Sequence, residues 1–148
     1  MTPHTWTVRV RTAAQDRATA ITDRDPFPVG PQLDFAPAEG PPTALQLFLG
    51  AVAADVLQGY RAAAARRRVP LHDAEIVVTC RLENPLVYLG VVGETGRPAI
   101  AALDGTLYVN ADADAAALAA LWSETLARAP LVATLEPALA LSLRWQAI

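Results

Sequence analysis

The fold of this chain is decided by residues 43–67, whose sequence is TALQLFLGAVAADVLQGYRAAAARR. Thr43 and, three residues later, Gln46 form the pattern of a capping box, which marks the start of a helix. Apolar side chains then repeat at helical spacing along one face: Leu45, Leu49, Val52, Val56 and Tyr60. Because Pro70 disfavours helix in the residue before it, we predict one long helix ending near Arg67. Its apolar composition predicts burial over much of its circumference.

The residues before this helix predict two short strands and a loop. Residues 6–12 alternate between apolar and polar side chains, which predicts a strand with one wet face. Its inward side chains would be Trp6, Val8 and Val10. Residues 18–22 predict a second short strand. Residues 25–42 are rich in proline, and we predict an irregular loop there because proline removes a backbone donor and fixes φ.

The residues after the helix predict more strands. Residues 74–82 alternate, with Cys80 on the apolar side, where a free cysteine is usually a small core residue. Residues 86–92 form a continuous apolar run, which predicts a strand covered on both faces. Residues 99–109 predict another strand, with a turn or bulge signal at residues 104–105.

A second helix and a last strand complete the predicted order. Either Asp112 or Asp114 would cap this helix, which runs to about Ala127 and ends before Pro130. Residues 138–145 alternate and predict the last strand. The tryptophans predicted to face the core are Trp6, Trp122 and Trp145.

This order of elements predicts an α+β fold, with two long helices against a largely antiparallel sheet. The chain has 148 residues, which fits a single domain, residues 1–148, with a real hydrophobic core. Hydrophobic residues make up 53% and charged residues 18% of the sequence. This composition excludes an intrinsically disordered protein.

Charge and hydropathy exclude other classes of protein. The net charge of −3 argues against binding to nucleic acid, which usually needs a basic face. No apolar run approaches the ~20 residues of a membrane helix, and the N-terminus lacks the pattern of a signal peptide. We therefore expect a cytoplasmic protein that does not associate with membranes. We interpret the basic run at residues 66–68 as neutralising the helix dipole rather than as an anion site.

Cysteine and histidine are scarce. Cys80 is the only cysteine, and His4 and His72 are the only histidines. The sequence therefore predicts no disulfide framework, no metal site and no cofactor. Both histidines are predicted to be surface residues without a partner.

Four short segments carry a resemblance to a known family. They are FPVG at 27–30, LQLFLGAV at 45–52, LYV at 107–109 and APLVATL at 129–135. In this order and spacing they resemble the OsmC/Ohr family of bacterial osmotically induced and organic hydroperoxide resistance proteins. The resemblance spans nearly the whole chain. It implies an OsmC-like fold and an intertwined homodimer whose long helices are buried between subunits.

The same resemblance implies a chemistry that this chain departs from. In the family, one cysteine attacks a hydroperoxide and a second resolves it, while an arginine and a glutamate hold the first sulfur as thiolate. Here Val52 and Ala129 stand at the two cysteine positions, and Thr43 stands near the acidic position. Arg17 and Arg24 are the nearby candidates for the arginine. Valine and alanine form neither a sulfenic acid nor a disulfide, so we expect no thiol peroxidase activity.

Three functions remain open. In the first, the family pocket binds a small apolar ligand at the dimer interface; beside Val52 and Ala129 its lining would include Thr43, Phe48, Asp55 and Leu131. In the second, carboxylates in that region, Asp55 and Glu136, support an enzyme with non-cysteine chemistry. In the third, the chain is a structural or partner-binding subunit, with residues 25–42 as a possible contact. The sequence names neither the ligand nor a pathway.

Overall fold

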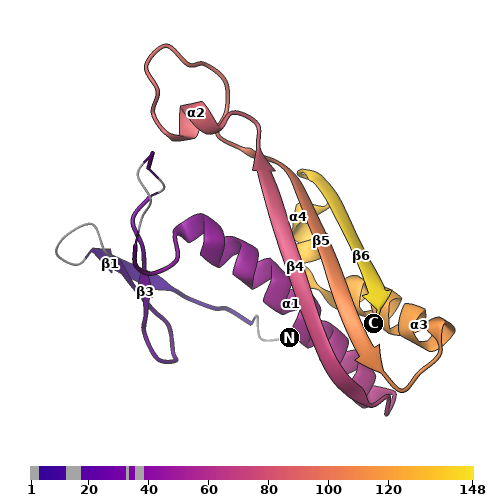
Figure 1. Ribbon diagram of the computed structural model, residues 1–148. Coiled ribbons are helices and arrows are strands. Elements are labelled where there is room, and N and C mark those ends of the chain that lie inside the picture. The colour runs from indigo at the N-terminus through magenta and orange to yellow at the C-terminus, as the bar shows by residue number, and fades with distance from the viewer. Residues whose placement is uncertain (1–3, 13–17, 33, 36–38) are drawn as a thin grey trace. The chain divides into compact units, whose positions relative to one another are not determined.

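The computed structural model describes residues 4–12, 18–32, 34–35 and 39–148, and its helices and strands are shown in Figure 1. The chain divides into two compact units, an N-terminal unit (Met1–Phe48) and a C-terminal unit (Leu49–Ile148). Each unit has its own three-stranded sheet. The long helix α1 (Ala44–Arg66) begins in the first unit and continues through the second.

The N-terminal unit is an antiparallel sheet in the order β1-β2-β3. Its strands are β1 (Arg9–Thr12), β2 (Ala18–Ile21) and β3 (Phe27–Val29). The proline-rich segment predicted to be an irregular loop therefore contains a strand. Pro28 is tolerated there because β3 is an edge strand, whose outer side needs no ladder hydrogen bonds.

The prediction that Trp6, Val8 and Val10 face a core is wrong for this chain. The Trp6 side chain is 84% exposed, and both valines are exposed as well. The strand also starts later than predicted, at Arg9, and all four of its residues are exposed. Alternation correctly indicated a strand, but the described residues of the N-terminal unit supply no layer to cover its apolar side.

The start of α1 agrees with the sequence prediction. The Gln46 backbone N–H donates to Thr43 Oγ1 at 3.3 Å, and the Thr43 N–H donates to Gln46 Oε1 at 2.8 Å. This is the reciprocal pair of a capping box. At the other end, Arg68 has a φ of 56° and the Val69 N–H donates to the Ala64 carbonyl at 2.9 Å. These two features close the helix in a Schellman motif.

The C-terminal unit contains the larger sheet, in the order β4-β5-β6. Its strands are β4 (Leu71–Leu82), β5 (Ile100–Ala111) and β6 (Ala140–Ala147). The pair β4/β5 is antiparallel, but β5 and β6 are parallel. The chain returns between them through α3 (Ala115–Arg128) and α4 (Pro130–Leu135). The α+β class is thus correct. Among the described residues three of the four strand pairings are antiparallel, as predicted, and the pairing of β5 with β6 is parallel.

The core of this unit lies between the sheet and the helices α1 and α3, which cover one of its faces (Figure 1). Alternate residues of β4 and β6 face this core, as predicted, and Trp122 and Trp145 contribute to it. The largest completely buried side chains are Tyr60, Leu103, Leu107 and Leu121. Burial of side chains of this size contributes about 1.5–3 kcal/mol each.

Burial of α1 is less extensive than predicted. Val52, Val56 and Tyr60 are fully buried, but the small residues Gly50 and Ala51 on another face are exposed. Some of the small, apolar residues of α1 are therefore not part of the hydrophobic core of this chain.

The predicted strand at residues 86–92 is wrong. The chain instead forms a short helix, α2 (Pro85–Tyr88), in a loop between β4 and β5. The side-chain oxygen of Asn84 accepts from the Leu86 N–H at 2.9 Å and from the Val87 N–H at 3.4 Å. Proline at the first helical position suits this start, because its missing N–H needs no partner there.

Two further predictions are corrected around β5 and α3. No turn interrupts β5 at residues 104–105; a Cβ on Gly105 would lie 2.6 Å from Leu143 Cδ2, so glycine permits the close approach of β6. Asp114, not Asp112, caps α3, with Asp114 Oδ1 accepting from the Ala117 N–H at 2.8 Å. Pro130 follows α3, as predicted, but also begins α4.

None of the helices in the described ranges has both the length and the apolar character that crossing a membrane requires.

We predict that Thr43→Ala lowers the free energy of unfolding by about 1 kcal/mol, because the Gln46 N–H loses its capping acceptor. The shift is measured by urea denaturation followed by circular dichroism. Thr7→Ala, at an exposed position before β1, is the control and leaves the transition unchanged. Equal transitions for both variants would contradict a stabilising cap.

Candidate functional site

Val52 and Ala129, the two positions that the resemblance in sequence assigns to the family cysteines, are both buried in the C-terminal unit. Val52 lies on α1 and is 0% exposed; Ala129 lies between α3 and α4 and is 3% exposed. One hydrogen bond ties their segments together, because the Leu131 N–H donates to Asp55 Oδ2 at 3.0 Å. Neither position carries a titratable or oxidisable atom.

Asp55 has a structural role in this arrangement. Ala129 is the N-cap of α4 but has no side chain that accepts a hydrogen bond, and Pro130 has no N–H. The Leu131 N–H is thus the first backbone donor of α4, and the Asp55 carboxylate satisfies it from α1. A negative charge at a helix N-terminus is also favourable to the helix dipole. The contact supports capping of α4 rather than acid–base chemistry.

The other predicted lining residues lie in different units. Thr43 and Phe48 belong to the N-terminal unit, whereas Asp55 and Leu131 belong to the C-terminal unit. Thr43 is nearly buried, with its hydroxyl engaged in the capping box, while Phe48 and Leu131 are half-buried. That these residues share one pocket stays a prediction.

Cys80, the only cysteine in the sequence, belongs to a different element from Val52 and Ala129. It lies on β4, half-buried on the side that faces the helices. Burial raises the pKa of its thiol, which keeps the sulfur protonated and poorly nucleophilic. Glu136, the other carboxylate considered for catalysis, is exposed where α4 ends. Within the described part of the chain, no three His, Cys, Asp or Glu residues are grouped to hold a metal ion.

The charged residues singled out in the sequence are mostly in surface pairs. His72 does have a partner, contrary to prediction: its Nε2 lies 2.8 Å from Asp112 Oδ1. Arg67 and Arg66 hydrogen-bond to Glu124 and thereby hold the pKa of its carboxyl below the ordinary value. This ion-pair cluster joins the end of α1 to α3.

The two arginines considered for the family position remain unassigned. Arg24 is exposed, and its backbone N–H donates to Thr22 Oγ1 at 2.9 Å. Arg17 lies outside the described residues.

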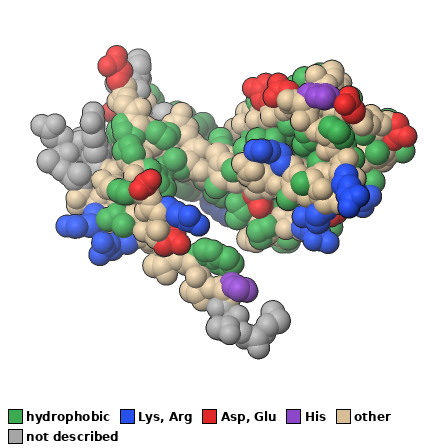
Figure 2. All heavy atoms as spheres, turned by 90° about the horizontal axis from the view of Figure 1, so that it is seen from below, with side chains coloured by type: hydrophobic (Ala, Val, Ile, Leu, Met, Phe, Trp, Pro, Cys, Tyr) green, Lys and Arg blue, Asp and Glu red, His purple; other side chains and the backbone are tan. Residues whose placement is uncertain are grey.

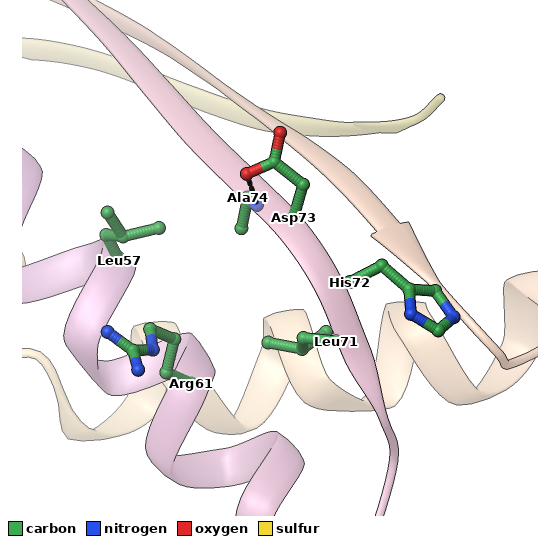
Figure 3. A pocket seen from close by; sticks show the side chains of 6 residues that line it. All are labelled: Leu57, Arg61, Leu71, His72, Asp73 and Ala74. Carbon is green, nitrogen blue, oxygen red and sulfur yellow. Dashed lines mark hydrogen bonds between the residues drawn. The ribbon is translucent and has the colours of Figure 1, made fainter.

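A surface pocket that the sequence did not reveal lies between α1 and the beginning of β4 (Figure 3). It has a volume of about 240 Å³ and is lined by Leu57, Arg61, Leu71, His72, Asp73 and Ala74. The register of β4 against β5 shifts between Leu71 and Asp73, and such bulges often redirect side chains next to binding sites. Helical spacing of Leu57 and Arg61 and the polar start of β4 were the only signals in the sequence.

Comparison with known proteins identifies the fold. No family model matches the sequence, and no curated protein is similar to it in sequence. An OsmC-like protein from Mycoplasma pneumoniae has a similar structure, with a TM-score of 0.80 at 14% identity over 98% of each chain.

Two organic hydroperoxide resistance proteins are also similar in structure. OsmC from Legionella pneumophila gives a TM-score of 0.68 at 13% identity over 97% of each chain. OhrB of Bacillus subtilis gives 0.60 at 16% identity, over 97% of this chain and 98% of that one. The OsmC-like fold inferred from the four sequence segments is therefore confirmed.

Asp55→Ala is expected to lower the free energy of unfolding by about 1–3 kcal/mol, because it leaves the Leu131 N–H without its acceptor. Asp55→Asn keeps an acceptor oxygen and should cost less. Denaturant unfolding measures both. Glu136→Ala removes the exposed carboxylate and serves as the control, with an expected effect within about 0.5 kcal/mol. A stability of Asp55→Ala equal to that of the control would contradict the capping role.

Proposed function

From the OsmC-like fold of this chain, we propose a homodimeric binding protein that lacks thiol peroxidase activity and takes a small apolar ligand in a pocket at the subunit interface. The observation that carries this proposal is the complete burial of Val52 and the near-complete burial of Ala129. At the positions where the family places its sulfur atoms, this chain has hydrocarbon.

Peroxide reduction by a pair of cysteines needs a thiolate that attacks the peroxide oxygen and becomes a sulfenic acid, and a second thiol that attacks the sulfenic sulfur to form a disulfide and release water. Val52 and Ala129 support neither step. The only sulfur nucleophile in the sequence, Cys80, is on another element, and its pKa is raised by burial. A neutral, half-buried thiol reacts slowly because the thiolate is the reactive form.

The chemistry of the proposed lining favours apolar ligands. Phe48 and Leu131 are half-buried and retain apolar surface that a ligand can cover. The one charged member, Asp55, already accepts a hydrogen bond from the Leu131 N–H. Covering apolar surface contributes about 25 cal/mol per Å², whereas a buried polar ligand group without a partner would cost free energy.

Exposed apolar side chains support the homodimer. Hydrophobic side chains are visible on the surface of the N-terminal unit (Figure 2), and the large exposed ones there are Trp6, Val8, Val10, Phe27 and Phe35. Apolar surface of this extent commonly marks a protein interface. The exposed small residues of α1, Gly50 and Ala51, also permit close approach of another helix.

The two other candidate functions have less support. The non-cysteine enzyme would use Asp55 or Glu136 as its catalytic carboxylate. Asp55 Oδ2 already accepts a hydrogen bond from the Leu131 N–H, and Glu136 is exposed to solvent at the end of α4. A structural or partner-binding subunit would use the same exposed apolar side chains as the homodimer. Ligand binding distinguishes it from the proposed function.

We predict no reduction of an organic hydroperoxide above background when a dithiol is the reductant. The reason is that no reactive cysteine pair exists. Peroxide consumption measures the rate for the wild type and for Cys80→Ser, and both should equal the blank. Turnover that survives Cys80→Ser would contradict the loss of activity.

A double variant provides the matching positive control. Val52→Cys combined with Ala129→Cys should form a disulfide when one equivalent of hydroperoxide is added, giving the alcohol and water. The product is detected by mass spectrometry as a loss of two hydrogens. Val52→Cys combined with Ala133→Cys, at an exposed position of α4, should not form that bond. Equal behaviour of the two pairs would contradict the assignment of the cysteine positions.

We also predict saturable binding of a fluorescent fatty-acid analogue to a dimer. Phe48→Ala and Leu131→Ala should each weaken binding at least about tenfold, because each removes several methylene-sized groups worth about 0.8 kcal/mol apiece. Fluorescence titration measures the affinity, and light scattering measures the mass.

Val92→Ala is the control for that titration, because Val92 is 99% exposed in the loop after α2. It should bind the probe as the wild type does. Unsaturable binding would contradict the apolar ligand, and a mass equal to one chain would contradict the dimer.

A further inference from the structure

Three arginines surround one glutamate beside the last turns of α1 and α3, and we call these four residues the Glu124 cluster. Arg66 donates to Glu124 Oε1 through Nε at 3.0 Å, and its Nη2 lies 2.9 Å from the same oxygen. Arg67 Nε donates to Glu124 Oε2 at 2.9 Å. Arg128 belongs to α3, and its Nε lies 3.8 Å from Glu124 Oε1. The basic run at residues 66–68, interpreted from the sequence as neutralising the helix dipole, thus gains a further arginine from another helix.

The Glu124 cluster carries more positive than negative charge. Arg67 and Arg66 hold the pKa of the Glu124 carboxyl below its ordinary value, so this group counts as one negative charge at neutral pH. Three guanidinium groups against one carboxylate leave a formal excess of two positive charges. The carbonyl ends of α1 and α3 lower this excess by at most about half a charge each, whereas Arg68, exposed beside Arg67 in the chain, raises it. The cluster is therefore a basic spot on a chain whose net charge is −3.

Part of the hydrogen-bonding capacity of the cluster is unused. Arg67 meets Glu124 through Nε, and its two Nη groups form no hydrogen bond with any described residue. Arg128, at 3.8 Å, is too far from Glu124 for a hydrogen bond. The Arg67 and Arg128 side chains are 51% and 67% exposed. Their donors are therefore accessible to an acceptor from solution.

Glu124 holds two of the guanidinium groups in place. Its side chain is only 16% exposed, and arginines of α1 donate to both of its carboxylate oxygens. A side chain that is already held loses less conformational entropy when a ligand binds. The carboxylate thus fixes Arg66 and Arg67 from the inner side and leaves the outer donors of Arg67 for a second acceptor.

We propose that the Glu124 cluster binds a phosphate group, either free phosphate or the phosphate of a small phosphomonoester. Its oxygens accept from the Nη groups of Arg67 and from Arg128. A phosphate fits better than a carboxylate because it carries a charge of about −1.5 to −2 at neutral pH and has three acceptor oxygens, and a guanidinium matches it in a fork. A nucleic acid would need a longer basic face than this cluster provides. The site lies within the C-terminal unit and does not depend on the proposed apolar pocket.

The test is a titration of the full-length, isotope-labelled chain, in which nuclear magnetic resonance follows the guanidinium carbons of the arginines. The probes are inorganic phosphate, methyl phosphate and acetate, at neutral pH and constant ionic strength, because salt screens exposed charges. Phosphate should give saturable shifts at Arg67 and Arg128. Acetate should bind at least about fivefold more weakly, since it has one charge and fewer acceptor oxygens. Methyl phosphate that binds as tightly as phosphate or more tightly assigns the site to a phosphomonoester, and weaker binding assigns it to free phosphate.

Two variants assign the donors. Arg67→Gln and Arg128→Gln should each weaken phosphate binding about fivefold, because each removes one exposed charge pair. Arg97→Gln is the matched control, since it removes the same charge from a side chain that is 76% exposed and lies 3.8 Å from Glu83. It should bind phosphate as the wild type does.

Each contrary result overturns the proposal. These results are the absence of saturable shifts, acetate binding as tight as that of phosphate, unchanged affinity in either Arg67→Gln or Arg128→Gln, or an equal loss in Arg97→Gln. Circular dichroism verifies that the variants fold, which is expected because Arg66 still pairs with Glu124 in each of them. The fatty-acid titration does not depend on these arginines, so the two proposals can fail separately.

Discussion

The packing of one stripe of α1 against the larger sheet is the constraint on which the C-terminal unit depends. Val56 and Tyr60 belong to the same buried cluster as Leu107 of β5 and Leu121 of α3. The Tyr60 hydroxyl donates to the Leu118 carbonyl, so even the polar atom of this stripe has a partner. Because sheet and helices each bury one face here, neither would remain folded without the other. The stripe therefore positions both Asp55 and Arg61, although they lie on different sides of the helix.

The same packing accommodates the buried hydrocarbon side chains of Val52 and Ala129. Cysteine, valine and alanine are all types that are commonly buried. Val52 and Ala129 are buried without leaving a polar group unsatisfied, and the backbone beyond Ala129 is held by Asp55 rather than by a side chain at the cap itself. Small apolar side chains therefore satisfy the packing of the C-terminal unit at these two positions.

Local signals allowed the sequence to predict α1, β4 and α3. The capping pair of Thr43 and Gln46 and the capping Asp114 lie within three residues of the atoms they bind, so no tertiary information is needed. Two features were not predicted, one because a local start signal was overlooked and the other because residues distant in the sequence decide it. Residues 86–92 have the composition of a strand, but Asn84 and Pro85 start a helix turn there. The parallel pairing of β5 with β6 depends on where α3 and α4 return the chain, which alternation does not encode.

The candidate site residues also differ in how much of their role the sequence alone could predict. The resemblance in sequence singled out Val52 and Ala129 because whole segments matched, and the comparison of structures confirms the OsmC-like fold. Asp55 was recognised as a nearby carboxylate, but its role required the position of the Leu131 N–H, 76 residues away in the sequence. The pocket between α1 and the beginning of β4 had no motif, since it combines an exposed helix position with a bulged strand end.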